Sequence, residues 1–291
     1  MLKWLSILLQ LTKFRISLLA TLFTSAGFIL AHHGFSEKMV LPVLAVLCLA
    51  SGACALNQYQ ERKIDRAMER TRGRPIPCQK LSPSTALWIS LAFLLMGLTI
   101  LFFGTHALAF GLGIFAILWY NGVYTYLKRW TPFAAIPGAL VGIIPPAIGW
   151  VSAGGTIFHP QFLALAIFSF LWQVPHFWLI LLGAGMDYER AGLPSLSRIF
   201  SPNQLKRITF IWICSATVLA LSLPLFYFNP SPFGNFFLLT ACLWLGWNAV
   251  RFLKSPPEII SFHLVFMKLN LFALWVISSL SLSSLLMGSS L

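Results

Sequence analysis

The chain has 291 residues, of which 58% are hydrophobic and 9% charged, and its formal net charge is +13. Apolar runs of about 20 residues recur along it, each long enough to cross the hydrocarbon core of a bilayer. The five cysteines form no C-x-x-C pair or metal-like spacing, which argues against a disulfide framework. The composition therefore excludes an ordinary soluble domain and predicts a polytopic membrane protein.

Residues 1–11 are apolar but short, with no small-residue cleavage site, and are expected to form an interfacial segment rather than a cleaved signal peptide. The longer runs predict an all-α bundle, because lipid offers the backbone no hydrogen-bond partners and no short alternating pattern of a barrel is present. We expect one transmembrane domain over 1–291. Its nine predicted spans are 14–33, 39–58, 83–103, 107–127, 133–152, 160–184, 206–228, 233–252 and 259–285.

The positions of lysine and arginine predict the orientation. If the N-terminus is cytoplasmic, eighteen of the twenty basic residues fall in the N-terminal segment and the even-numbered connections, the exceptions being Lys38 and Lys268. This pattern predicts an N-in, C-out protein of the cell (inner) membrane with its charged loops on the cytosolic face. The net charge is mostly this topology signal, so no nucleic-acid partner is expected.

The polar loops that connect the spans on the predicted cytosolic side, called gaps below, alternate in the charge that they carry. A large charged patch follows the second span and a small basic gap the fourth, and an acidic gap at 187–189 follows the sixth and another small basic gap the eighth. The period of four helices predicts two related four-helix halves plus a ninth helix. Both acidic gaps then lie on one membrane face, where they are able to close over a shared cavity.

The charged patch at 57–75 holds three of the seven acidic residues and six of the twenty basic ones. If the second span continues as a helix past Asn57, then Asn57, Glu61 and Asp65 lie about 6 Å apart along one face. Like charges at this spacing destabilise a helix unless a cation lies between them. Their hard oxygen atoms suit Mg²⁺, which takes the rest of its shell from water and substrate phosphate.

Basic residues follow the same segment and suit a diphosphate. Arg62, Arg66 and Arg70 form a neighbouring stripe, and the chain then turns toward Arg74. A second interpretation is an ion-paired, solvated helix end, since Arg62 with Asp65 and Arg66 with Glu69 are opposite charges three residues apart. For Glu69 this second interpretation is the one we expect.

These residues resemble a known family. Asn57, Glu61 and Asp65, followed by Met68-Glu69-Arg70-Thr71 and Arg74-Pro75, are similar to the first aspartate-rich motif of the UbiA-type intramembrane prenyltransferases, and most similar to the haem O branch. The resemblance spans roughly 11 to 200. Its further motifs are Leu11-Thr12-Lys13-Phe14-Arg15, Tyr124-Thr125-Tyr126-Leu127-Lys128-Arg129 with Thr131-Pro132, Pro145-Pro146-Ala147-Ile148-Gly149-Trp150, Trp172-Gln173-Val174-Pro175-His176-Phe177-Trp178, Asp187-Tyr188 and Ala191-Gly192-Leu193-Pro194.

The chain departs from the family pattern at both motifs. Glu61 stands where the family usually has Asp, which keeps the charge on a longer arm. In the second motif, near 185–194, the family usually has Lys-Asp-Asp-Tyr, whereas this chain keeps only Asp187 of the two acids. Either Asp187 ligates or orients a magnesium ion, with Glu189 as a weaker substitute, or this half mainly binds the other substrate.

The resemblance implies a Mg²⁺-dependent enzyme that transfers a farnesyl group from farnesyl diphosphate to a vinyl group of protohaem IX, giving haem O and diphosphate. This reaction needs no protein nucleophile, and the sequence shows no catalytic triad or Cys/His pair. The implied catalytic and metal residues are Asn57, Glu61, Asp65 and Asp187. The implied substrate-binding residues are Arg62, Arg70, Arg74, Tyr124, Lys128, Arg129, His176 and Tyr188.

Two other functions stay open on the sequence alone. One is prenyl transfer to a quinone precursor or another aromatic acceptor, and the other is a helical transporter or haem-binding membrane protein. A transporter would carry acids or broken helices near the membrane midplane, whereas here the acids gather at one face. His176 is expected either to contact haem or to pack in the bundle. Lys268, within the last span, is expected to meet a haem propionate, the diphosphate or a carbonyl group.

Overall fold

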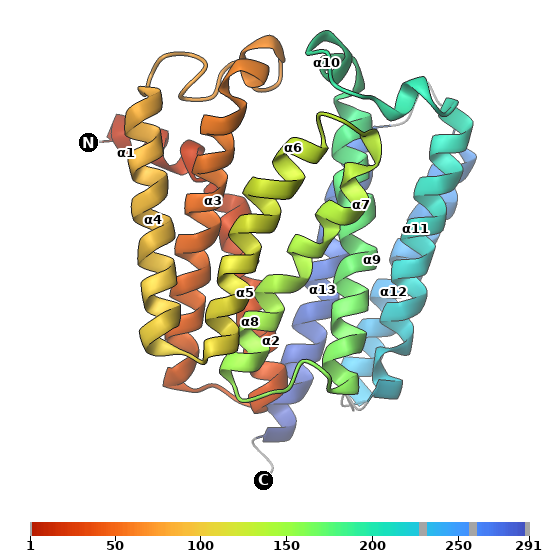
Figure 1. Cartoon of the computed structure of the whole chain (residues 1–291). Coiled ribbons are helices and arrows are strands. Elements are labelled where there is room, and N and C mark those ends of the chain that lie inside the picture. Colours follow the sequence, from red (N-terminus) through yellow and green to blue (C-terminus); the bar gives the residue numbers. More distant parts are fainter. Residues whose placement is uncertain (1, 227–231, 256–260, 289–291) are drawn as a thin grey trace.

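The computed structural model describes residues 2–226, 232–255 and 261–288, which form helices and no strand (Figure 1). Nine helical stretches within these ranges are long and apolar enough to cross a membrane, so the predicted all-α membrane bundle is confirmed. The main helices of these stretches are α2 (Phe14–His32), α3 (Val40–Ala67), α4 (Pro83–Gly104), α5 (Ala107–Ile117), α8 (Ile144–Ser152), α9 (Pro160–Gly183), α11 (Pro202–Ser222), α12 (Pro232–Lys254) and α13 (Phe262–Gly288).

The predicted spans agree with the helices to within a few residues at most ends. The seventh begins at Pro202 rather than 206, because Ser201 and Gln204 form a reciprocal capping box and a proline fits the first helical turn. The second continues to Ala67, as is required if Asn57, Glu61 and Asp65 are to form one wall of a metal site, called the metal wall below. Residues 227–228 and 259–260 of the predicted spans lie outside the described residues.

Neighbours in the chain are mostly neighbours in space. α3 packs between α2 and α4, and α13 contacts α12, α9 and α2. The short α1 (Leu2–Leu11) lies at the opposite end of the bundle from the end of α13 (Figure 1). An odd number of spans requires the first span to begin and the last span to end on opposite sides in this way. The N-in, C-out orientation and the division into two four-helix halves stay predictions.

α2 and α8 approach each other closely because two glycines face the contact. A Cβ atom on Gly27 would lie 2.1 Å from the carbonyl oxygen of Pro146, and one on Gly149 would lie 1.9 Å from that of Thr24. Small residues allow such backbone contact between helices in a membrane. The two helices are thereby fixed side by side.

The fourth and fifth spans are not regular helices. In the fourth, α5 passes into a π-helix, η2 (Leu118–Tyr124), and then α6 (Thr125–Leu127). The fifth is split into η3 (Pro132–Ala134), α7 (Ala135–Gly138), η4 (Ala139–Ile143) and α8 by its prolines and glycines. Such interruptions are tolerated where the backbone lines a cavity within the protein.

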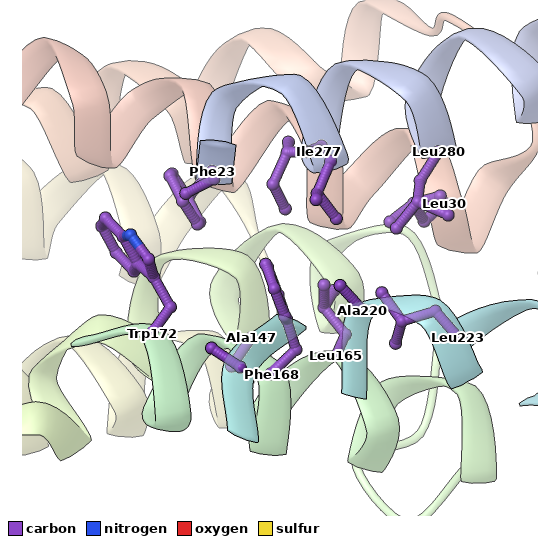
Figure 2. Packing of buried hydrophobic residues seen from close by; sticks show 14 of the residues in the cluster. Phe23, Leu30, Ala147, Leu165, Phe168, Trp172, Ala220, Leu223, Ile277 and Leu280 are labelled. Atoms are coloured by element: carbon purple, nitrogen blue, oxygen red, sulfur yellow. The ribbon is translucent and has the colours of Figure 1, made fainter. Parts of the chain in front are cut away.

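The main apolar core lies between α2, α8, α9, α11 and α13. Figure 2 shows Phe23 and Leu30 facing Trp172, Phe168 and Leu165 across it. Phe23 stacks on Trp172 at 5.4 Å between ring centroids, and Trp172 Nε1 donates to the Leu269 carbonyl oxygen at 3.1 Å. This core holds the bundle together, while most of the charged residues gather at one end.

That charged end carries the loop 68–82 and the short α10 (Gly185–Arg190), which lie on the same side of the bundle in Figure 1. α1 joins this end, because the buried Gln58 Nε2 donates to the carbonyl oxygens of Gln10 and Leu11 at 2.8 and 2.9 Å. The two acidic gaps are thus on one face, as the sequence predicted.

Candidate functional site

A cavity of about 290 Å³ lies within the bundle at the charged end. α2, α3, η2, α8 and α9 line it, together with the loop 68–82 and α10. Most of its lining is apolar or aromatic. Its charged residues together with Asn57 are called the polar end below: Lys13, Asn57, Glu61, Asp65, Arg70, Arg74 and Lys128.

The predicted metal wall exists as one face of α3. Asn57, Glu61 and Asp65 are buried in the protein, with 1%, 5% and 2% of their surfaces exposed, and all three line the cavity. They line it together because the helix continues to Ala67 and repeats nearly every four residues. The sequence interpretation of their common face is therefore confirmed, whereas their metal role stays a prediction.

Each of these side chains meets a basic residue. Lys13 Nζ donates to Asn57 Oδ1 at 3.1 Å, and Lys128 Nζ forms an ion pair with Glu61 Oε1. Arg74 Nη1 contacts both carboxylate oxygens of Asp65, at 2.7 and 2.8 Å. A buried carboxylate is costly unless it is paired in this way. With Arg70, which also lines the cavity, two acids and four cations thus share this end.

The second acidic gap reaches this end through Asp187. The backbone N–H of Arg70 donates to Asp187 Oδ2 at 2.9 Å, and Arg190 lies 4.0 Å from the same carboxylate. Tyr188, the next residue, lines the cavity. Asp187 itself is not among the lining residues, so its carboxylate ties the loop 68–82 to α10.

The residues present fit a magnesium ion by their chemistry. Mg²⁺ is usually held by one or two carboxylates together with water and substrate phosphate, and Glu61 and Asp65 supply two on a common face. In the described parts of the chain, no three His, Cys, Asp or Glu side chains gather as a metal-binding group. The donor set on α3 suits a site that water and substrate phosphate complete, and the metal role of Asp187 stays a prediction.

Two predicted substrate-binding arginines lie outside the cavity lining. Arg62 Nη1 donates to the Tyr59 carbonyl oxygen at 2.7 Å, and its guanidinium lies over the Tyr59 ring. Arg129 donates to the Gln60 carbonyl oxygen at 3.2 Å and lies over the Tyr126 ring. Arg62 therefore packs on its own helix, whereas Arg129 joins the segment after α6 to the end of α3.

The remaining acids of the two gaps make surface pairs. Glu69 lies 3.7 Å from Arg72 and 3.6 Å from Arg190, and it is mostly exposed. The expected pairing with Arg66 is not what is found, because α3 ends at Ala67 and Glu69 lies beyond the helix. Glu189 accepts from Ser197 Oγ at 2.9 Å and is absent from the cavity lining.

Aromatic rings form the wall next to the polar end. Tyr124 stacks on Tyr120 and on Phe177, at 5.8 and 5.4 Å, and Lys128 Nζ lies 5.4 Å from its ring centroid. The π-helix carries both tyrosines, and π-turns occur often at functional sites. His176 also lines the cavity. Of its two alternatives from the sequence, contact with haem requires such a position.

Sequence reasoning missed Lys13 as a site residue. It lies between α1 and α2 with a left-handed backbone (φ 47°), which turns its side chain into the cavity. Burial lowers the pKa of Lys13 from 10.5 to about 8. The signal was its place in the family's opening motif. Tyr120 and Gln173 were missed as well, since only the three-dimensional fold brings them to the lining.

Lys268 lies elsewhere. Its Nζ donates to Asn248 Oδ1 at 2.6 Å, beside a separate cavity of about 200 Å³ between α11, α12 and α13. Of the expected partners, a carbonyl oxygen is the one found, here from a side-chain amide. The diphosphate is not a partner that this position favours, because Lys268 is absent from the main cavity's lining.

The UbiA prenyltransferase family model matches residues 20–284. The chain belongs to this family. It is 34% identical over 221 residues to a protoheme IX farnesyltransferase of Oleidesulfovibrio alaskensis, covering 75% of this chain and 77% of the relative. It is 42% identical over 194 residues to one of Geobacter sulfurreducens, covering 67% and 70%.

Solved structures of UbiA proteins share the fold. A digeranylgeranylglyceryl phosphate synthase superposes with a TM-score of 0.75 at 17% identity, over 97% of this chain and 98% of that one. A UbiA homologue from Archaeoglobus fulgidus bound to GPP and Mg²⁺ gives 0.72 at 15% identity, over 96% and 99%. This UbiA prenyltransferase is therefore a multi-pass membrane enzyme with the family's helical architecture.

Proposed function

We propose that this UbiA prenyltransferase transfers a farnesyl group from farnesyl diphosphate to a vinyl group of protohaem IX, giving haem O and diphosphate. The relatives named protoheme IX farnesyltransferase, at 34% and 42% identity over most of the chain, support this reaction. The motifs that resemble the haem O branch, above all Trp172 to Trp178, agree with this similarity.

One observation carries the proposal: a single cavity joins a charged end to an apolar and aromatic remainder. Farnesyl diphosphate has the same division, with an anionic head on a hydrocarbon chain. The cations Lys13, Arg74 and Lys128 match the head, and the side chains of α2, α3 and α8 match the tail. A channel for a small polar solute would need no such apolar depth.

The leaving group is handled at the polar end. Glu61 and Asp65, with Asn57 beside them, would hold the magnesium, which when bound neutralises the charge of the diphosphate. Arg70, Arg74 and Lys128 donate to the diphosphate oxygens and stabilise the charge that develops as the allylic C–O bond breaks. Asp187 keeps the loop that carries Arg70 and Arg74 in place through the Arg70 N–H.

The carbon chemistry takes place next to the aromatic wall. Breaking the C–O bond gives a farnesyl cation and diphosphate, and the rings of Tyr120, Tyr124 and Phe177 stabilise the cation through their π faces. The vinyl group of haem supplies the electron pair for the new C–C bond. Water then adds to the resulting haem-side cation and loses a proton, which gives the hydroxyethylfarnesyl product. The apolar lining excludes water until that bond has formed.

The enzyme is proposed to be one domain over 1–291 in the inner membrane, with the polar end facing the cytosol. The excess of lysine and arginine at this end supports that orientation. In a Cys78→Ser background, a membrane-impermeant thiol reagent should label Lys38→Cys on intact cells and Arg72→Cys after permeabilisation. The reverse pattern would invert the orientation.

The reaction is tested by expressing the chain in membranes that lack haem O synthesis and analysing the extracted haems by mass. A farnesylated, hydrated haem is expected. A prenylated aromatic acid, formed when a quinone precursor is supplied instead, would favour the other acceptor class. Good expression without a haem product would refute the proposed acceptor.

A further inference from the structure

His176 occupies a special place in the cavity. It lines the wall one turn after Trp172 on α9, and its ring lies 5.1 Å from Trp172 and 4.7 Å from Phe266, between centroids. Its only titratable atoms are the two ring nitrogens. The role of His176 therefore depends on which ring nitrogen carries the hydrogen and which one is free to bind a ligand.

Asn270 on α13 decides the tautomer. Asn270 Nδ2 donates to the Phe266 carbonyl oxygen at 2.8 Å, so the amide oxygen is the atom that points at His176. That oxygen lies 2.7 Å from His176 Nδ1. An amide oxygen only accepts, so Nδ1 must carry the hydrogen. In the neutral ring, Nε2 then holds a free lone pair.

We propose that His176 Nε2 is an axial ligand of the iron of the haem acceptor, and that Asn270 is the residue that positions it. This inference rests on the proposed function. Neutral imidazole is the common protein ligand of haem iron. A ligating histidine almost always donates its other N–H to a carbonyl or carboxylate, which fixes the ring and raises its basicity. The His176–Asn270 pair has that arrangement before any haem is bound.

The position also suits the reaction. His176 contacts Phe177 at 5.6 Å, Phe177 stacks on Tyr124 at 5.4 Å, and Lys128 lies over Tyr124. A row of rings therefore connects the iron ligand with the diphosphate end. Fixing the iron at His176 leaves rotation about the iron–nitrogen bond as the main freedom of the macrocycle, and that rotation selects which edge faces the farnesyl group.

The test measures iron ligation directly on the purified full-length protein in nanodiscs. Protohaem IX is added, and absorption and resonance Raman spectra report the axial ligand. The wild type should show a histidine-ligated spectrum, and His176→Ala should lose it. Adding imidazole to His176→Ala should restore it, as expected when the only defect is the missing ligand. His263→Ala is the matched control, because His263 also stacks on Phe266, at 6.5 Å, but does not line the cavity.

Asn270 is tested by its effect on His176. Asn270→Leu should weaken haem binding by about tenfold while keeping the histidine-ligated spectrum. Asn270→Asp, which still accepts from Nδ1, should bind at least as tightly as the wild type. Metal-free protoporphyrin IX should bind the wild type more weakly than protohaem IX, and His176→Ala should abolish this preference.

The two proposals fail in different ways. If the wild type makes farnesylated haem and His176→Ala shows the wild-type spectrum, the iron ligand is another group and this inference is overturned while the proposed function stands. If the wild type forms no farnesylated haem at all, the proposed function is refuted, and the inference about His176 falls with it. Loss of the spectrum in His263→Ala as well as His176→Ala would also overturn the specific role of His176.

Discussion

The backbone N–H of Arg70 donates to the carboxylate of Asp187, 117 residues further along the chain, at 2.9 Å. This one contact joins the two acidic gaps of the sequence over the cavity. It uses the main chain of Arg70, a residue that lines the cavity, and does not engage the guanidinium. We therefore expect the second motif to act on the first by holding its loop in place.

Asp187→Asn should keep most of the wild-type kcat/KM, because the amide oxygen still accepts from the Arg70 N–H. Asp187→Ala should lower kcat/KM by about tenfold, since the loop that carries Arg70 and Arg74 is released. Radiolabelled farnesyl transfer in membranes measures both variants. Equal losses in the two variants would instead identify Asp187 as a metal ligand.

Asp65→Ala should lower turnover by at least about 10²-fold, because Arg74 loses its partner and the metal one of its carboxylates. Glu69→Ala is the control: its carboxylate is exposed and makes only long ion pairs, so most activity should remain. Immunoblots of the membrane fraction confirm that both variants insert. Wild-type activity in Asp65→Ala would refute the metal role.

Removing magnesium with EDTA should stop the reaction, and adding it back should restore the rate. In Glu61→Gln, the Mg²⁺ concentration for half-maximal rate should rise about tenfold, since a hard anionic ligand becomes neutral. Glu61→Asp should show a smaller rise. Glu189→Gln, whose carboxylate accepts from Ser197 away from the cavity, should titrate like the wild type.

Lys13 predicts a pH dependence of substrate binding. Its folded-state pKa is about 8, below the ordinary 10.5, so its charge is lost as the pH rises through about 8. The KM for farnesyl diphosphate should rise above this pH, by roughly tenfold for one charged hydrogen bond. Lys13→Arg stays charged at every pH used, and its KM should change less. Parallel profiles for both proteins would contradict the assignment.

Gly27→Ala should destabilise the bundle by about 1–3 kcal/mol, because a Cβ would overlap the Pro146 carbonyl and force α2 from α8. Gly111→Ala is the matched control. Gly111 lies in α5 with no atom within 4 Å of an added Cβ, so alanine should be neutral or stabilising by about 1 kcal/mol. Thermal unfolding in detergent, followed by size exclusion, compares the two.

The fold was largely predictable because the hydrocarbon core of a bilayer requires long apolar segments and allows few backbone structures other than the helix. The common face of Asn57, Glu61 and Asp65 was predictable for a similar reason, since it depends on helix periodicity alone. Local interruptions were harder. The π-helix at Leu118–Tyr124 and the broken fifth span arise from packing against neighbours, and a hydropathy pattern does not record which backbone groups find partners there.

The partners of the charged residues were the least predictable part. Spacing suggested Arg62 with Asp65, but the structure pairs Asp65 with Arg74, which a turn of the loop 68–82 brings back to α3. Lys13 reaches Asn57 across 44 residues. His176 finds Asn270 across 94. Contacts over such separations depend on the whole bundle, and no local pattern in the sequence encodes them.

The matched charges at the polar end have a consequence for anyone dissecting this enzyme. Glu61 with Lys128 and Asp65 with Arg74 are mutual counter-ions, so removing one member lowers the stability of the fold and the activity together. Single alanine substitutions will not separate the two effects. Reversing the charges of both partners, and comparing this variant with each single reversal in a double-mutant cycle, would separate residues that are required for stability from residues that are required for catalysis.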